Sequence, residues 1–206
     1  MRARQGYVIL AGLLAAIGPV TRFAQAQNWS PGGRWVAYSL AESPAQAWPG
    51  WVFGSEEPAG NQKADPTVYR VWTTEVETGD SVLLYESLEP TTQPGWKLDG
   101  TALAYGRVRT EKAGAKRLEL IVQNAPDRFQ VVESAPLGGM ADLRRLVDLP
   151  VLWSPEGRFL VVPRLEPEGL AVVKVENGSV AFNLNGASRA SWSPDGARLV
   201  YFRQAN

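Results

Sequence analysis

Residues 192–201 read Trp192-Ser193-Pro194-Asp195-Gly196-Ala197-Arg198-Leu199-Val200-Tyr201, and this stretch decides the fold because the chain repeats its pattern four times. Each copy opens on a tryptophan, and a glycine follows four positions later. Recurrence at intervals of tens of residues is typical of folds in which each repeat packs on its neighbours. The four tryptophan and glycine pairs are Trp29 and Gly33, Trp96 and Gly100, Trp153 and Gly157, and Trp192 and Gly196.

Each copy predicts a tight turn followed by a buried strand. Proline and aspartate preset a turn, and glycine adopts the positive φ that a sharp reversal needs. The residues seven to nine positions after each tryptophan are apolar or aromatic, as in Leu199-Val200-Tyr201. A run that is apolar on both faces favours a strand covered on both sides. The second copy has Lys97-Leu98 in place of Ser-Pro but keeps the tryptophan, the glycine and the apolar run.

The segments 192–201 and 29–38 resemble the WD-repeat-like blades of TolB-type bacterial β-propellers. The same repeat occurs in the propeller domains of prolyl oligopeptidase and dipeptidyl peptidase relatives. The resemblance covers about residues 28–206, and it implies that each corner joins the innermost strand of a blade to its second strand. Such a resemblance is specific for the fold and says little about function.

The intervals between copies each contain a further hairpin. The third interval is the tightest, because Asn177-Gly178 between two β-rich runs is a strong hairpin signal. The expected fold is therefore all-β: an incomplete β-propeller of three four-stranded blades plus the first half of a fourth, preceded by a signal-peptide helix. We expect the blades to begin near residues 28, 95, 152 and 191. Since propellers close with four to eight blades, we expect a piece of a longer propeller, an interrupted reading frame or half of an assembly.

Residues 1–26 have the pattern of a secretory signal peptide. Arg2 and Arg4 give a basic start, residues 7–20 are mostly apolar, and Ala24-Gln25-Ala26 places small residues where a signal peptidase reads them. The apolar stretch is shorter than the roughly 20 residues of a spanning helix. We expect export to the periplasm or the cell exterior and a partial propeller domain over residues 27–206, with an uncleaved membrane anchor as the alternative.

The amino-acid composition limits the classes of molecule that the chain is expected to bind. Without residues 1–26 the chain has 18 basic and 21 acidic residues, so it lacks the clustered basic surface that nucleic acid or an anionic membrane requires. The absence of cysteine excludes disulfides and a lipid-modified cysteine. We expect the partner to be another protein or the missing remainder of the propeller.

The chain is poorly equipped for catalysis. It contains no histidine, which is the usual general base of nucleophile triads and the commonest metal ligand. Residues 186–190, Gly-Ala-Ser-Arg-Ala, resemble a nucleophile elbow faintly but lack its closing glycine. We therefore expect no enzyme, no catalytic residue, no cofactor and no metal.

Aromatic residues form the remaining candidates. The four repeat tryptophans are expected to pack between blades, since an aromatic ring buries a large area. The insertion at about residues 41–67 contains Trp48, Trp51 and Phe53, which either cover a sheet edge or form a partner-binding patch. Arginines recur eleven positions after three of the tryptophans, at exposed strand ends or as a ring of cations at one rim; they are Arg107, Arg164 and Arg203.

Two functional hypotheses remain. In the first, the chain is a non-catalytic exported scaffold for protein or ligand binding. In the second, it is the N-terminal propeller portion of an exported prolyl oligopeptidase-type serine peptidase whose hydrolase domain is absent from this sequence. The sequence favours the first, because no triad is present.

Overall fold

Fourteen strands in four antiparallel sheets make up the described part of the chain, which covers residues 28–42, 67–137, 143, 146, 149–165 and 167–203 of a computed structural model. The all-β prediction is confirmed for these residues, and they include no helix that is long and apolar enough to cross a membrane. The signal-peptide segment, the insertion aromatics Trp48, Trp51 and Phe53, and residues 204–206 lie outside the described residues.

We number the sheets as blades 1 to 4 in chain order. Blades 1 to 3 each have four strands in sequential order, and blade 4 has two. Blade 1 consists of β1 (Asn28–Trp29), β2 (Trp35–Glu42), β3 (Val68–Glu75) and β4 (Ser81–Ser87). Blade 2 consists of β5 (Gly95–Trp96), β6 (Leu103–Thr110), β7 (Lys116–Ala125) and β8 (Arg128–Leu137). Blade 3 consists of β9 (Leu152–Trp153), β10 (Phe159–Leu165), β11 (Glu168–Lys174) and β12 (Val180–Asn185), and blade 4 of β13 (Ala187–Trp192) and β14 (Leu199–Arg203).

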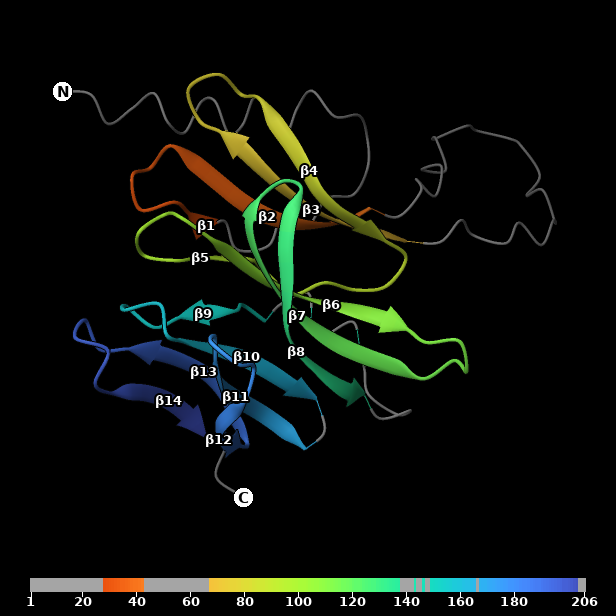
Figure 1. The fold of residues 1–206 in the computed structure, drawn as a ribbon, viewed down its shortest axis with the longest axis vertical. Coiled ribbons are helices and arrows are strands. Elements are labelled where there is room, and N and C mark those ends of the chain that lie inside the picture. The colour runs from red at the N-terminus through yellow and green to blue at the C-terminus, as the bar shows by residue number, and fades with distance from the viewer. Residues whose placement is uncertain are drawn as a thin grey trace, which may run out of the picture.

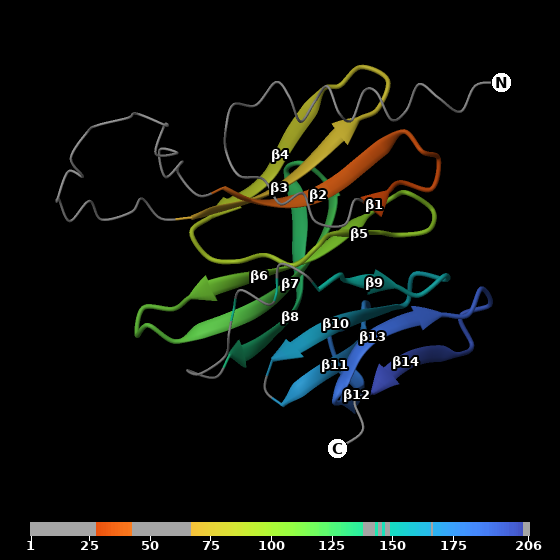
Figure 2. The same ribbon diagram turned by 180° about the vertical axis from the view of Figure 1, so that it is seen from behind.

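Blades 1, 2 and 3 follow one another down the molecule, and blade 4 lies beside blade 3 (Figure 1). Their first strands β1, β5, β9 and β13 lie along the same side, as the reverse view also shows (Figure 2), and β5 contacts both β1 and β9. The first strand of blade 4 begins at Ala187, four residues before the position expected from the sequence, because it continues directly from the Gly186 turn after β12.

Each repeated phrase forms the turn between the first and second strands of a blade. The four glycines have φ between +69° and +73°. In the first copy the Gly33 amide donates to the Ser30 carbonyl at 2.8 Å, and the Ser30 Oγ accepts from the amide of Trp35 at 2.9 Å. The second copy keeps the turn without the serine, since the Gly100 amide donates to the Lys97 carbonyl at 2.9 Å. The turn therefore depends on the glycine more than on the Ser-Pro pair.

Apolar side chains between the blades form the core. One cluster joins blades 2 and 3 through residues such as Ala104, Leu120, Leu160 and Val173. A second joins blade 3 to blade 4, and a third joins blades 1 and 2 around Tyr105. Because strands such as β6 and β10 are buried on both faces, they carry the continuous apolar runs seen in the sequence.

Candidate binding surface at the inner strands

The repeat tryptophans lie on the first strands, and two of them contact the preceding blade. The Trp153 Nε1 on β9 donates to the Gly95 carbonyl on β5 at 2.8 Å. The Trp192 ring on β13 stacks on Phe159 of blade 3, with centroids 6.3 Å apart. Trp29, in the first blade, is 47% exposed. In these two positions the ring therefore acts as a wedge between neighbouring blades.

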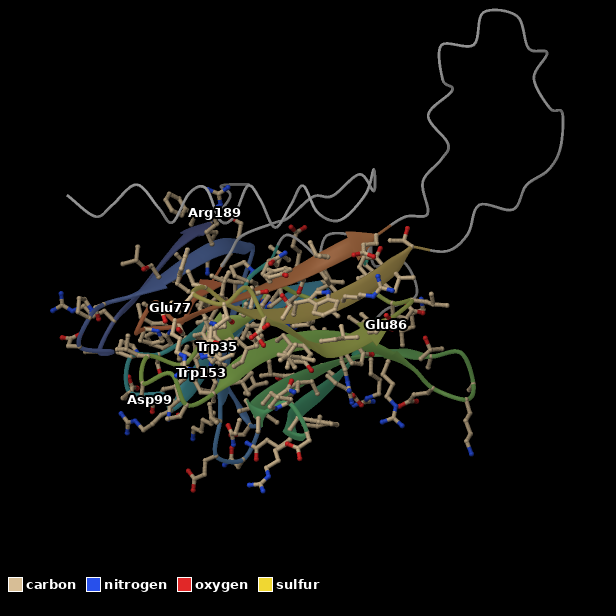
Figure 3. The ribbon with its side chains drawn as sticks, turned by 90° about the horizontal axis from the view of Figure 1, so that it is seen from above. Trp35, Glu77, Glu86, Asp99, Trp153 and Arg189 are labelled. Carbon is tan, nitrogen blue, oxygen red and sulfur yellow. The ribbon has the colours of Figure 1, made fainter. Side chains whose placement is uncertain are left out.

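A cavity of about 290 Å³ opens among the first strands of blades 2, 3 and 4. Trp96, Trp153 and Trp192 line it, and the other lining residues are Gly95, Val151, Leu152, Ala190 and Ser191. Seen from above, Trp153 lies on the same side of the molecule as Trp35 and Asp99, whereas Glu86 lies toward the other side (Figure 3). The repeat thus brings three rings from distant parts of the sequence to one surface.

Two indole N–H groups at this surface have no acceptor among the described residues. The Nε1 atoms of Trp96 and Trp192 are buried, and neither makes the interblade bond that Trp153 makes. A buried donor without an acceptor is costly, so a native structure rarely leaves one without a reason. Because both atoms are buried, an acceptor oxygen in the cavity reaches them only if a ligand shifts the two rings.

The recurring arginines differ from one blade to the next. Arg107 is only 16% exposed, and its Nη2 lies 2.8 Å from the Glu119 carboxylate on β7. Its guanidinium also lies 5.2 Å from the ring centroids of both Tyr85 and Phe129. The expectation of an exposed strand end is therefore wrong for Arg107, because its carboxylate partner on the next strand holds it inside. Arg164 instead donates to the Asn185 side chain at 3.3 Å.

Burial and hydrogen bonds shift the pKa values of three side chains in this part of the molecule. Burial acts to raise the pKa of the Glu119 carboxyl, but hydrogen bonds from Arg107 and Arg109 outweigh it and the pKa is lowered. Burial raises the pKa of Tyr105 to about 12. The Asp99 pKa falls well below its usual range because Lys97 and Thr101 donate to the carboxylate. All three groups stabilise blades or turns, and none is placed to react with a substrate in the cavity.

No catalytic constellation is found in the described part of the chain. Ser188, the serine of the faint elbow sequence, lies within strand β13 and is exposed. The residue before that strand, Gly186, has φ +71° and forms a turn between two strands, whereas a nucleophile elbow leads into a helix. Among the described residues no group of three or more acidic, histidine or cysteine side chains is placed to hold a metal ion.

Sequence reasoning missed Glu119, the two unpaired indoles and the connection between blades 1 and 2. In that connection the Thr92 amide donates to the Gly106 carbonyl at 2.8 Å, and the Thr92 carbonyl accepts from the Ser39 hydroxyl at 2.8 Å. One signal for Glu119 was present, because it is a single carboxylate within the apolar run Leu118-Glu119-Leu120-Ile121-Val122. Such a charge inside a doubly covered strand requires a partner.

Comparison with known proteins identifies the fold. No family model and no curated protein matches the sequence. Among solved structures, TolB from Acinetobacter baumannii matches with a TM-score of 0.53 and 13% identity over 89% of this chain and 38% of that one. The propeller domain of the Trilobed protease from Pyrococcus furiosus matches with a TM-score of 0.51 and 15% identity, over 86% of this chain and 48% of that one. An acylaminoacyl peptidase matches with a TM-score of 0.51 and 13% identity, over 84% of this chain and 27% of that one.

This is a TolB-like β-propeller fold. The chain spans less than half the length of each of these three proteins. The neighbours include TolB and two kinds of peptidase, so the likeness concerns architecture and not activity.

Proposed function

We propose that this chain is a non-catalytic, exported propeller scaffold that binds an extended peptide segment of another protein at the inner-strand cavity. The single observation that carries the proposal is the cavity of about 290 Å³ that Trp96, Trp153 and Trp192 line, two of which have a buried N–H without an acceptor among the described residues. A cavity of this size accepts one or two side chains, and a peptide backbone offers a carbonyl acceptor at every residue. Tryptophan rings also supply the apolar contact area typical of binding hot spots.

The absence of histidine from the whole sequence supports the non-catalytic part of the proposal. Export rests on residues 1–26, with their basic start, apolar stretch and Ala24-Gln25-Ala26. Mass spectrometry of the protein purified from the periplasm or the medium should find an N-terminus at Gln27. An intact Met1 in a cytoplasmic fraction would contradict export.

Panning a random peptide library on the full chain tests the cavity. The peptide with the highest affinity is then titrated against Trp96→Phe and Trp192→Phe, which remove the N–H and keep most of the ring. Each substitution should weaken binding about fivefold, since a hydrogen bond contributes about 1 kcal/mol. Trp72→Phe on β3 is the matched control outside the cavity and should leave the affinity unchanged. Equal affinity for all four proteins would refute the proposed site.

The peptidase hypothesis is a second candidate, since the solved structures that resemble the chain include propellers of peptidases. A serine-reactive fluorophosphonate applied to the full product of the reading frame distinguishes the two. Covalent labelling would favour a peptidase with a hydrolase domain elsewhere in the product, whereas no labelling together with peptide binding supports the scaffold.

A further inference from the structure

A second cavity, of about 230 Å³, lies between blades 2 and 3. Two rows of paired residues, one from each blade, line it; they are Gly106, Leu120 and Glu133 on blade 2 and Val162, Ala171 and Asn183 on blade 3. Ala171, in the middle of its row, has a short side chain, which leaves space between the two sheets. Both blades are complete four-stranded sheets, so the cavity involves neither blade 4 nor its open edge.

Most of the cavity wall is apolar and belongs to the core between the two blades. Leu120, Val151 and Val162 are buried members of the cluster that joins blades 2 and 3. On the outer strands β8 and β12 the wall is partly exposed, since Glu133 is half-buried and Val180 is 41% exposed. The cavity therefore reaches solvent between the outer strands, and its inner part suits an aliphatic group.

Two opposite charges line this cavity without forming an ion pair with each other. The Glu133 carboxylate on β8 has no hydrogen bond or ion pair within the described residues, and burial raises its pKa although the Arg164 charge acts to lower it. Arg164 on β10 donates from its Nη1 to the Asn185 side chain at 3.3 Å, and no carboxylate of the described chain pairs with it. The two charges thus act on each other across the cavity without contact.

This arrangement matches the chemistry of a small zwitterion with an apolar side chain. A partly buried carboxylate without a partner is costly, and a ligand ammonium would pair with Glu133 through charge-assisted hydrogen bonds. The planar guanidinium of Arg164 suits a ligand carboxylate. The cavity is smaller than the roughly 300 Å³ at which pockets for drug-sized ligands begin, so its ligand is a small molecule. A free aliphatic α-amino acid carries both charges and an apolar group.

We propose that the cavity between blades 2 and 3 binds a free aliphatic α-amino acid, with its ammonium on Glu133, its carboxylate on Arg164 and its side chain against the apolar wall. This site goes beyond the peptide binding proposed for the tryptophan cavity. The two cavities share only Val151 among their lining residues, so each can be tested without the other.

Other small ligands fit the cavity less well. A divalent cation needs several oxygen ligands, and Glu133 is the only carboxylate among the lining residues. A simple anion would pair with Arg164 but would also meet the negative charge of Glu133. A longer peptide would bring amide groups against a wall that is mostly apolar, where they would lose hydrogen bonds to water. Only a ligand with both charges satisfies both side chains.

The test is isothermal titration calorimetry of the full chain with free leucine at neutral pH. Isocaproate, which lacks the ammonium, and isoamylamine, which lacks the carboxylate, should each bind at least about tenfold more weakly than leucine. Glu133→Gln should remove the preference for leucine over isocaproate, and Arg164→Gln should remove the preference over isoamylamine. Glu77→Gln, at an exposed carboxylate in the β3–β4 turn, is the matched control and should leave all three affinities unchanged.

No heat of binding with leucine, isoleucine or valine would overturn the proposal, and so would equal affinities for leucine and isocaproate. These two results come from the unaltered chain, so they do not depend on how well a variant folds. Ala135→Leu should abolish leucine binding, because the larger side chain fills the cavity that Ala135 lines. Trp96→Phe and Trp192→Phe should bind leucine normally, so failure of this site is distinguishable from failure of the tryptophan cavity.

Discussion

Strands β6 and β14 come from the same place in the repeat, and their surroundings differ completely. Both follow a tryptophan and a glycine turn, and both pair antiparallel with the first strand of their blade. Ala104 of β6 is fully buried between blades 2 and 3, whereas its counterpart Val200 is 66% exposed. The phrase therefore specifies the hairpin locally, while burial depends on the neighbouring blade and on the third strand. In a repeat protein, each interface contributes separately to stability.

Arginine substitution gives the largest expected contrast between these strands. Arg107→Ala should lower the free energy of unfolding by about 3 kcal/mol, because it removes one partner of the buried Glu119 ion pair and a guanidinium stacked between two rings. Arg203→Ala should change it by less than about 0.5 kcal/mol, as for other exposed sites. Urea denaturation of both variants measures the difference. Equal effects would mean that the ion pair adds nothing to the fold.

Alkaline titration isolates one buried group in the same strand. The Tyr105 pKa is raised by burial to about 12, so the folded state keeps the phenol neutral after an unfolded tyrosine, with its ordinary pKa of about 10, has ionised. Stability should stay level below about pH 10 and then fall by about 1.4 kcal/mol per pH unit toward pH 12. Tyr105→Phe should remove this slope, with Tyr201→Phe on β14 as the matched control. A slope that persists in Tyr105→Phe would assign it to another group.

Truncation at one repeat position tests the contribution of the neighbouring blade. Val161 on β10 is 1% exposed and packs in the cluster between blades 3 and 4, whereas Val200 occupies the same position on β14. Val161→Ala should cost about 2 kcal/mol through lost burial and the resulting cavity. Val200→Ala should cost little. Equal costs for the two substitutions would mean that packing between blades 3 and 4 adds nothing to stability at Val161.

Local features of the fold were predictable because each copy of the repeat encodes the same turn and the same hairpin. The turn needs only a glycine at one position, and the hairpins need only short β-rich runs with turn residues between them, so the strands of blades 1 to 3 matched the expected ones. Contacts between residues far apart in the sequence were not predictable. Nothing in the sequence around Arg107 indicates that it meets Glu119 twelve residues later, since that contact depends on the register of two strands.

The candidate site was predictable only in part. The recurrence of tryptophan indicated rings between blades, and Trp153 and Trp192 lie there. It did not indicate that one indole would find a carbonyl and two would not, because this depends on the spacing between neighbouring first strands. Gly95 shows how close that spacing is, since a Cβ there would lie 2.1 Å from the Val151 carbonyl oxygen. Backbone approach of this kind has no signature in a single sequence.

The smallest expected effect separates backbone conformation from packing in the repeated turn. Gly32 and Gly33 are neighbours in the first copy, and a Cβ on either would meet nothing within 4 Å. Gly33 has φ +69°, whereas Gly32 does not have a positive φ. Gly33→Ala should therefore cost about 1 kcal/mol from left-handed strain alone. Gly32→Ala should be neutral or slightly stabilising, because alanine restricts the unfolded chain.

Thermal unfolding of these two variants side by side measures the cost of the turn without any change in contacts. Gly100 and Gly157 share the positive φ, but Pro31 and Lys97 respectively lie near their Cβ positions. Only the first copy gives the backbone effect by itself. Equal melting temperatures for Gly32→Ala and Gly33→Ala would mean that the glycine recurs for a reason other than its φ, and the Ser30 side chain, which accepts from the Trp35 amide, would then be the local determinant of this turn.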